Sequence, residues 1–185
     1  MRKYCVLTFI LFLSFTVLAQ GEFEEIMAGY KMEAERQTEG YIDKMVQNGI
    51  LNKEDNARLI EFTSDTMKIE KTVFLFFEDE NYSTLDMKVA LSYQMDEYDK
   101  LLNKYYKLLI NILSPEDKIK MRDAQRLWLK YRDSETDINY NIISPNKYMG
   151  GGTMWPVVAM ERTLDLIKER VFSIFQFIDC IDIER

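Results

Sequence analysis

The chain has 185 residues, of which 47% are hydrophobic and 30% charged, and its formal net charge is −7. This length is enough for one domain with a sizeable core. The acidic balance gives no electrostatic reason to bind nucleic acid or anionic lipid and favours basic partners, unless the charge serves solubility alone. The chain contains no histidine, which removes the commonest general base and the commonest metal ligand.

The first 19 residues predict a secretory signal peptide. Arg2 and Lys3 precede an apolar run over residues 6–18, and Ala19 supplies the small residue before the cleavage site. The run is too short to span a bilayer of roughly 30 Å. Cleavage would leave Gln20 first and change the formal charge from −7 to −9. We therefore expect an exported protein, with no membrane span after cleavage.

Cysteine usage predicts a fold without an internal disulfide. Cys5 falls in the signal peptide, so Cys180 is the one thiol left in the mature chain. Packing must then supply the stability of the fold. A bridge through Cys180 to another chain stays open, and the sequence does not predict the oligomeric state.

Two helices are predicted over residues 23–77. Apolar residues at helical spacing over 23–46 are followed by Asn48-Gly49, a pair that tolerates the left-handed backbone at a helix end. Asn52 is then a candidate N-cap, with acidic residues in the first turn that follows. The second helix continues to Phe77, and we expect its apolar stripe to consist of Ile60, Met67, Phe74 and Phe77.

The next segment gives the clearest helical pattern of the chain. Ser83 or Thr84 can cap it, and from Tyr98 the apolar residues recur at i, i+3, i+4, i+7, i+10, i+11 and i+14. This spacing predicts an amphipathic helix with an apolar face made of Met87, Ala90, Leu91, Tyr98, Leu101, Leu102, Tyr105, Leu108, Leu109 and Ile112.

Two further helices have apolar seams with alternating steps of three and four. Ser114-Pro115 begins the first, which is broken near Ser144-Pro145-Asn146, and Thr153 can cap the second. The two seams consist of Met121, Ala124, Trp128, Tyr131, Glu135, Ile138 and Ile142, and of Val157, Met160, Leu164, Ile167, Val171, Ile174 and Ile178.

The matching seams and their short connection predict an antiparallel pair. Glu135 is an acid on an apolar seam and needs a partner, for which Arg132, Arg162 and Arg170 are candidates. Because no strand pattern is comparably strong, we expect an all-α, mostly antiparallel bundle with an additional N-terminal helical hairpin.

No catalytic, cofactor or metal site is predicted. Asp137, Asn139 and Asn141 imitate the start of a calcium loop, but the later glycine is missing and Tyr148 stands where a glutamate is needed. Asp133, Glu135 and Asp137 are the carboxylates available for glycoside hydrolysis. Carboxylates spaced along a helix are more often solvated or paired with arginine, so we expect no enzyme.

One set of motifs resembles the LprI-like lysozyme inhibitor family. The set comprises Asp99-x-x-Leu102-Asn103-x-x-Tyr106, Gln125-x-x-Trp128-x-x-x-Arg132-Asp133, Gly151-Gly152-Thr153 and Arg170. The resemblance covers about residues 62–178. It implies a small helical domain, assigned here to residues 62–180, that inhibits lysozyme by protein–protein contact. It also implies a bacterial protein exported to the periplasm or cell surface. Residues 20–61 would be an N-terminal helical extension.

The family likeness also shows where this chain departs from its relatives. Many members have a cysteine where Thr136 stands and a second one near Met160. The interhelical disulfide that the resemblance implies is therefore missing here, and the apolar seam must hold the helices together.

Two roles are open for the motif residues. In the first, Trp128 fills the core, while Gln125, Arg132 and Asp133 bond neighbouring helices. In the second, the motif residues surround a surface groove near the glycine turn and bind a partner. The candidate partner-binding residues are Gln125, Trp128, Arg132, Asp133, Gly150, Gly151, Gly152, Thr153 and Trp155.

The function predicted first is inhibition of a basic lysozyme-type peptidoglycan hydrolase, with the acidic face and the loop over residues 148–155 docking on the enzyme. The alternatives are a scaffold or ligand-binding domain of the cell envelope and a hydrolase that depends on Glu135.

Overall fold

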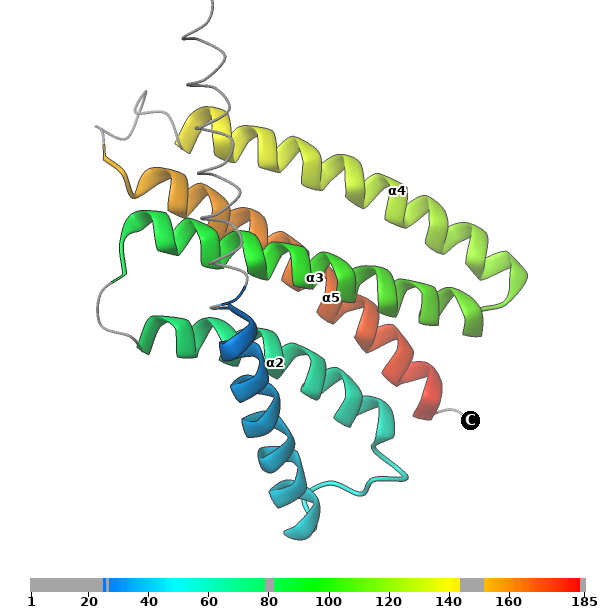
Figure 1. Cartoon of the computed structure of the whole chain (residues 1–185). Helices are drawn as coiled ribbons and strands as arrows, with labels where there is room; N and C mark the ends of the chain where they lie inside the picture. Colours follow the sequence, from blue (N-terminus) through cyan, green and yellow to red (C-terminus); the bar gives the residue numbers. More distant parts are fainter. Residues whose placement is uncertain (1–24, 26, 79–81, 144–151, 184–185) are drawn as a thin grey trace, which may run out of the picture.

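The computed structural model describes residue 25 and residues 27–78, 82–143 and 152–183, and the regular structure in these residues is helical throughout. A helix over residues 27–47 is followed by α2 (Ala57–Glu78), α3 (Thr84–Ile112) and α4 (Pro115–Ile138). Helix α4 continues into the π-helical turn η1 (Asn139–Ile143), and α5 spans Trp155–Ile183 (Figure 1). The predicted all-α bundle is confirmed.

Several sequence-based expectations concern residues outside the described part of the chain. They are the signal peptide over residues 1–19, the helix break at 144–146, Tyr148, and the first two glycines of the triplet, Gly150 and Gly151.

Helices α3 and α5 form the centre of the bundle. They run in the same direction and make the most extensive contact among helices α2 to α5, while α2 and α4 run the opposite way on either side (Figure 1). Helix α5 is thus antiparallel to α4, as the sequence predicted, but its main partner is α3. The reason is that α3 and α5 both present continuous apolar faces, whereas α4 is polar over most of its surface.

The predicted apolar faces of α3 and α5 are confirmed as the core-facing sides, although Met87, Leu108 and Ile112 of α3 are only partly buried. On α5, every predicted seam residue except the partly buried Met160 is buried, and α3 buries Tyr98, Leu102, Tyr105 and Leu109 against them. The shared core cluster consists of Phe62, Ile69, Leu91, Tyr98, Leu101, Leu102, Tyr105, Leu109, Val157, Leu164, Ile167, Val171, Ile174, Phe175 and Ile178.

The N-caps predicted for α3 and α4 are confirmed, whereas the one predicted for α5 is not. Ser83 and Asp86 form a capping box at α3, and Ser114 accepts the amide of Asp117 at α4. At α5, however, the carbonyl of Met154 accepts the first helical hydrogen bond, from Val158. The prediction that Thr153 caps this helix is therefore wrong by one residue.

For the first two helices, the predicted end at Gly49 is confirmed, whereas the predicted N-cap at Asn52 is wrong. Gly49, at φ +70°, ends the 27–47 helix in a Schellman motif in which Ile50 N–H donates to the Met45 carbonyl, as predicted. Asn52 accepts the amide of Glu54, but this begins only a turn, and the helix itself starts at Ala57. The acidic residues expected in its first turn therefore precede it.

The apolar stripe predicted for α2 is wrong. The residues that face the core are Phe62, Thr66, Ile69 and Val73, and Phe74 is 62% exposed. Thr66 can be buried because its hydroxyl donates to the carbonyl of Phe62 at 2.9 Å. A stripe chosen by apolar residues alone overlooks such a self-satisfied threonine and so selects another face of the helix.

The seam predicted for α4 is also wrong. Of its members, Met121 and Trp128 pack partly buried against the core, whereas Tyr131, Ile138 and Ile142 are exposed. The buried residue of α4 is Gln125. The helix turns this polar side toward the bundle because α5 offers an arginine there, as described next.

Candidate functional site

The residues of the sequence motif meet where α4 crosses α3 and α5. Trp128 lies in the middle of α4, half-buried, with an arginine on each side. The guanidinium of Arg132, one turn further along, lies 5.5 Å from the centroid of the indole, and that of Arg170 from α5 lies 5.7 Å from it. Both distances fit cation–π contacts. Trp128 thus joins α4 to α5 and also lies at the edge of the core.

Arg132 lies near the surface, with 24% of its side chain exposed. Its Nη1 lies 3.5 Å from Oδ1 of Asp99 on α3, and its Nε and Nη2 donate to Oδ1 of Asp133 at 3.1 and 2.9 Å. Burial raises the pKa of Asp99, and the charge of Arg132 acts in the opposite direction. Arg132 therefore links α3 and α4 near the surface, where one ion pair contributes about 1 kcal/mol or less.

Arg170 is held inside the site. Its Nε donates to Oε1 of Gln125 at 2.9 Å, while its Nη2 is buried with no hydrogen-bond partner among the described residues. Burial lowers the pKa of Arg170, and the nearby Tyr106 of α3 acts the other way. The buried amide of Gln125 is therefore matched to an arginine across the helix interface. Gln125 of the α4 motif and Arg170 of α5 thus form one contact between the two helices.

Two of the three carboxylates considered for hydrolysis bond to neighbouring side chains. Asp133 is bound to Arg132, and Asp137 accepts the amide of Asn141 at 2.6 Å. The predicted ion pair of Glu135 is absent among the described residues, because Arg132 and Arg170 bond elsewhere and Arg162 donates to Asn139 at 2.9 Å. Within the described residues, no three metal-binding side chains converge.

The glycine turn lies apart from the Trp128 cluster. Gly152 has φ +149°, and a Cβ at this position would lie 3.9 Å from the indole of Trp155, the first residue of α5. Trp155 precedes Arg170 by four helical turns, or roughly 22 Å along the helix. The structure thus brings Gln125, Trp128, Arg132 and Asp133 together and separates Gly152, Thr153 and Trp155 from them.

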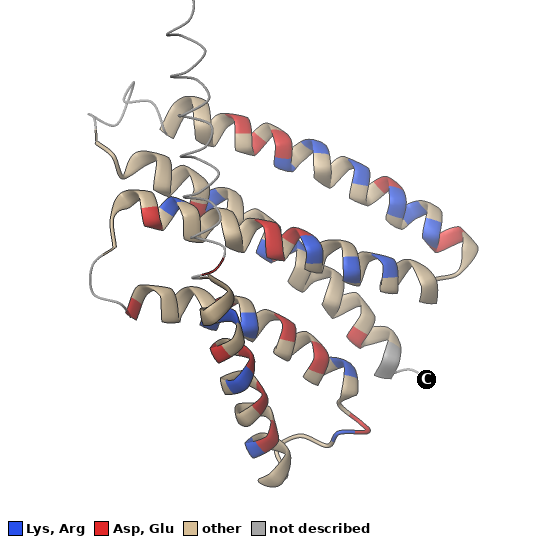
Figure 2. Ribbon diagram, viewed as in Figure 1, with Lys and Arg blue, Asp and Glu red and all other residues tan. Residues whose placement is uncertain are grey.

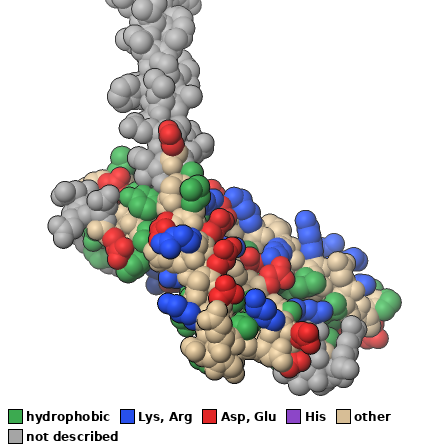
Figure 3. Space-filling view, turned by 60° about the horizontal axis from the view of Figure 1, so that its bottom comes forward, with side chains coloured by type: hydrophobic (Ala, Val, Ile, Leu, Met, Phe, Trp, Pro, Cys, Tyr) green, Lys and Arg blue, Asp and Glu red, His purple; other side chains and the backbone are tan. Residues whose placement is uncertain are grey.

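A groove with acidic walls separates the 27–47 helix from α2, and the sequence motifs gave no sign of it. A cavity of about 500 Å³ is lined by Glu39, Ile42, Asp43, Ala57, Ile60, Glu61, Ser64, Asp65 and Lys68. A second cavity of about 180 Å³ shares Asp65 and Lys68 and extends the groove to Glu35 and Glu97. In Figure 3, acidic side chains form a band across this face, flanked by lysines and arginines.

The signal that could have revealed the groove is the spacing of Glu35, Glu39 and Asp43. Residues four apart lie on one face of a helix, so these three acids form a row along the 27–47 helix. On the opposite wall, Asp65 accepts hydrogen bonds from Lys104 Nζ at 2.6 Å and from Tyr105 Oη at 2.9 Å. Tyr105 therefore packs in the core and also donates a hydrogen bond to a wall of the groove.

Comparison with known proteins supplies a family. The family model described as "Lysozyme inhibitor LprI" matches residues 78–173, which is more than half of the chain. Neither a curated protein nor a solved structure gives a significant match. None of the helices in the described part of the chain combines the length and apolar character needed to cross a bilayer. The chain belongs to the LprI lysozyme inhibitor family.

Proposed function

We propose that this protein is an exported inhibitor that binds a basic lysozyme-type muramidase and blocks it by protein–protein contact, without chemistry of its own. The observation that carries the proposal is the family match over residues 78–173. The net charge of −7 supports it, because an acidic protein is drawn to a basic enzyme over distances of several ångströms before contact.

We place the first contact on the acidic groove. Its rim acids Glu35 and Glu39 are exposed, and no ion pair to either is present among the described residues. Basic side chains around the active-site cleft of a muramidase can therefore approach these carboxylates without displacing a lysine of the inhibitor. Exposed charges of this kind raise the association rate and make binding sensitive to salt.

We assign the Trp128 cluster a supporting role in this function. Trp128, Gln125 and Arg170 connect α4 to the α3–α5 centre, so the cluster positions α4. The turn at Gly152 and Trp155 is a second candidate contact, because a glycine there lets a partner approach the backbone closely.

The test measures binding of the chain from residue 20 to an immobilised basic lysozyme at low and high salt. Glu35→Lys combined with Glu39→Lys should weaken binding about tenfold at low salt, mainly through the association rate. Glu161→Lys with Asp165→Lys is the matched control, because these exposed acids have the same spacing on α5 and lie outside the groove. Equal effects of the two pairs would remove the groove from the proposal, and an absence of binding by the unmodified chain would end the proposal itself.

A further inference from the structure

Helix α4 carries an apolar stripe that no described residue of the protein covers. Leu127 is 66% exposed, Tyr131 52% and Ile138 43%, and Ile142 of η1 continues the line at 41%. We call these four residues the α4 stripe. It lies on a different side of the helix from Gln125 and Trp128, which face the bundle. Exposed apolar residues that gather on one side of a helix mark a candidate interaction surface.

Three residues of the stripe, Leu127, Tyr131 and Ile138, have the spacing of a coiled-coil seam. Ala124, Tyr131 and Ile138 recur every seven residues, and Leu127 and Ser134 follow the first two by three residues. Helices with this pattern pack along one seam with side chains interdigitated. In an antiparallel pair related by a two-fold axis between Tyr131 and Ser134, Leu127 faces Ile138 of the other helix, and the large Tyr131 faces the small Ser134.

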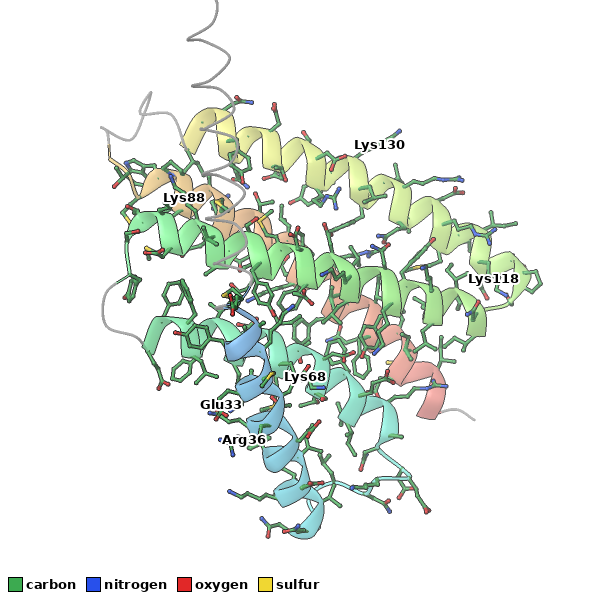
Figure 4. The ribbon with its side chains drawn as sticks, in the orientation of Figure 1. Glu33, Arg36, Lys68, Lys88, Lys118 and Lys130 are labelled. Carbon is green, nitrogen blue, oxygen red and sulfur yellow. The ribbon has the colours of Figure 1, made fainter. Side chains whose placement is uncertain are left out.

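The charges of α4 select the same arrangement. All six basic residues of the helix lie between residues 118 and 132, and three of its six acids lie between 133 and 137. In Figure 2, most of the blue on α4 lies in its N-terminal part and red lies toward its C-terminal end. Two antiparallel copies would bring the basic part of each helix beside the acidic part of the other. Lys130, which projects away from the bundle (Figure 4), would then lie near Asp137 of the second copy. A parallel pair would instead place like charges side by side.

From the exposed stripe, its heptad spacing and the self-complementary charges, we propose that two copies of this protein associate through antiparallel packing of their α4 helices. The helix has no net charge within an acidic protein, so a basic enzyme is not attracted to it as it is to the groove, whereas a second copy meets no repulsion there. The proposal is independent of lysozyme inhibition, because the stripe and the acidic groove are different surfaces.

The test is the mass of the chain from residue 20 in solution, measured by sedimentation at concentrations on the order of 1 to 500 µM. We expect a dimer whose dissociation constant rises ~100-fold or more in Leu127→Asp, since the substitution removes a buried leucine from both copies. Phe74→Asp is the matched control, because Phe74 is 62% exposed on α2 and should leave the dimer intact. Circular dichroism verifies that each variant is folded.

A charge exchange tests the direction of packing. Lys130→Asp and Asp137→Lys should each weaken the dimer several-fold, and the two together should restore it. A monomer at every concentration, or a dimer that Leu127→Asp leaves unchanged, would overturn the proposal. A double exchange that fails to restore association would overturn the antiparallel arrangement.

Discussion

Replacing Phe62 by alanine tests how α2 is joined to the rest of the bundle. Phe62 is 5% exposed, and its ring stacks on Phe175 of α5 with centroids 3.9 Å apart and an interplanar angle of 7°. The edges of Tyr105 and Phe172 each lie 5.1 Å from it, centroid to centroid. Phe62 therefore contacts three aromatic rings, from α3 and α5.

The magnitude follows from burial and ring contacts. Truncating a buried phenylalanine costs about 3–5 kcal/mol, and losing three ring pairs places Phe62 in the upper part of that range. We expect Phe62→Ala to lower the free energy of unfolding by about 4 kcal/mol and the melting temperature by roughly 8–16 °C for a chain of this size.

The assay is urea unfolding followed by circular dichroism at 222 nm, with Phe74→Ala as the control. Phe74 lies on the same helix but is 62% exposed, so its truncation should cost about 0.5 kcal/mol or less. Equal losses in the two variants, or a larger loss for Phe74→Ala, would refute the orientation of α2 described above and favour the stripe that the sequence alone predicted.

Three further predictions follow from polar contacts. Gln125→Leu should cost about 1–3 kcal/mol in the same unfolding assay, because it leaves the buried guanidinium of Arg170 without its hydrogen-bond acceptor. Ser83→Ala should cost about 1 kcal/mol through the loss of the α3 capping box, and Ser83→Asn should recover most of that loss. Burial raises the pKa of Tyr98 and of Tyr105 above the ordinary value of 10.0. At a pH just above 10, each tyrosine is therefore still protonated in the folded protein but has lost its proton in the unfolded chain. Stability should therefore fall as pH rises above about 10, by up to ~1.4 kcal/mol per pH unit for each tyrosine, and Tyr98→Phe should make that fall less steep in unfolding curves recorded from pH 8 to 11.5.

The sequence predicted best those helices whose inward faces are apolar throughout. On α3 and α5, residues such as Tyr98, Leu102, Ile167 and Ile174 recur at helical spacing and are buried as expected. Periodicity is sufficient there because burial of apolar area decides the orientation of the helix.

The orientation of α4 could not be predicted in that way. The face it turns inward carries Gln125, and its burial depends on Arg170, which lies 45 residues further along the chain. A buried polar residue is acceptable only when a partner satisfies it, and one-dimensional spacing does not reveal that partner. The error for α2 has a similar origin, since the hydroxyl of Thr66 is satisfied within its own helix.

Only part of the candidate site could be predicted from the sequence. The motif residues Gln125, Trp128 and Arg132 do lie together, because they occupy one face of α4 at steps of three and four. Trp155 is distant from these residues because it lies at the start of α5, whereas α5 contacts them through Arg170. The acidic groove depends on the packing of the 27–47 helix against α2, which no motif encodes.

The central claim is that the protein inhibits a basic muramidase by binding it. The direct measurement is the rate at which a fixed amount of lysozyme clears a peptidoglycan suspension at low salt, as the chain from residue 20 is added. We expect the rate to fall to near zero at about one inhibitor per enzyme and to recover when salt is added. Glu135→Gln should inhibit equally well. Full lysozyme activity at a large excess of the protein, for each of several lysozymes, would contradict the account.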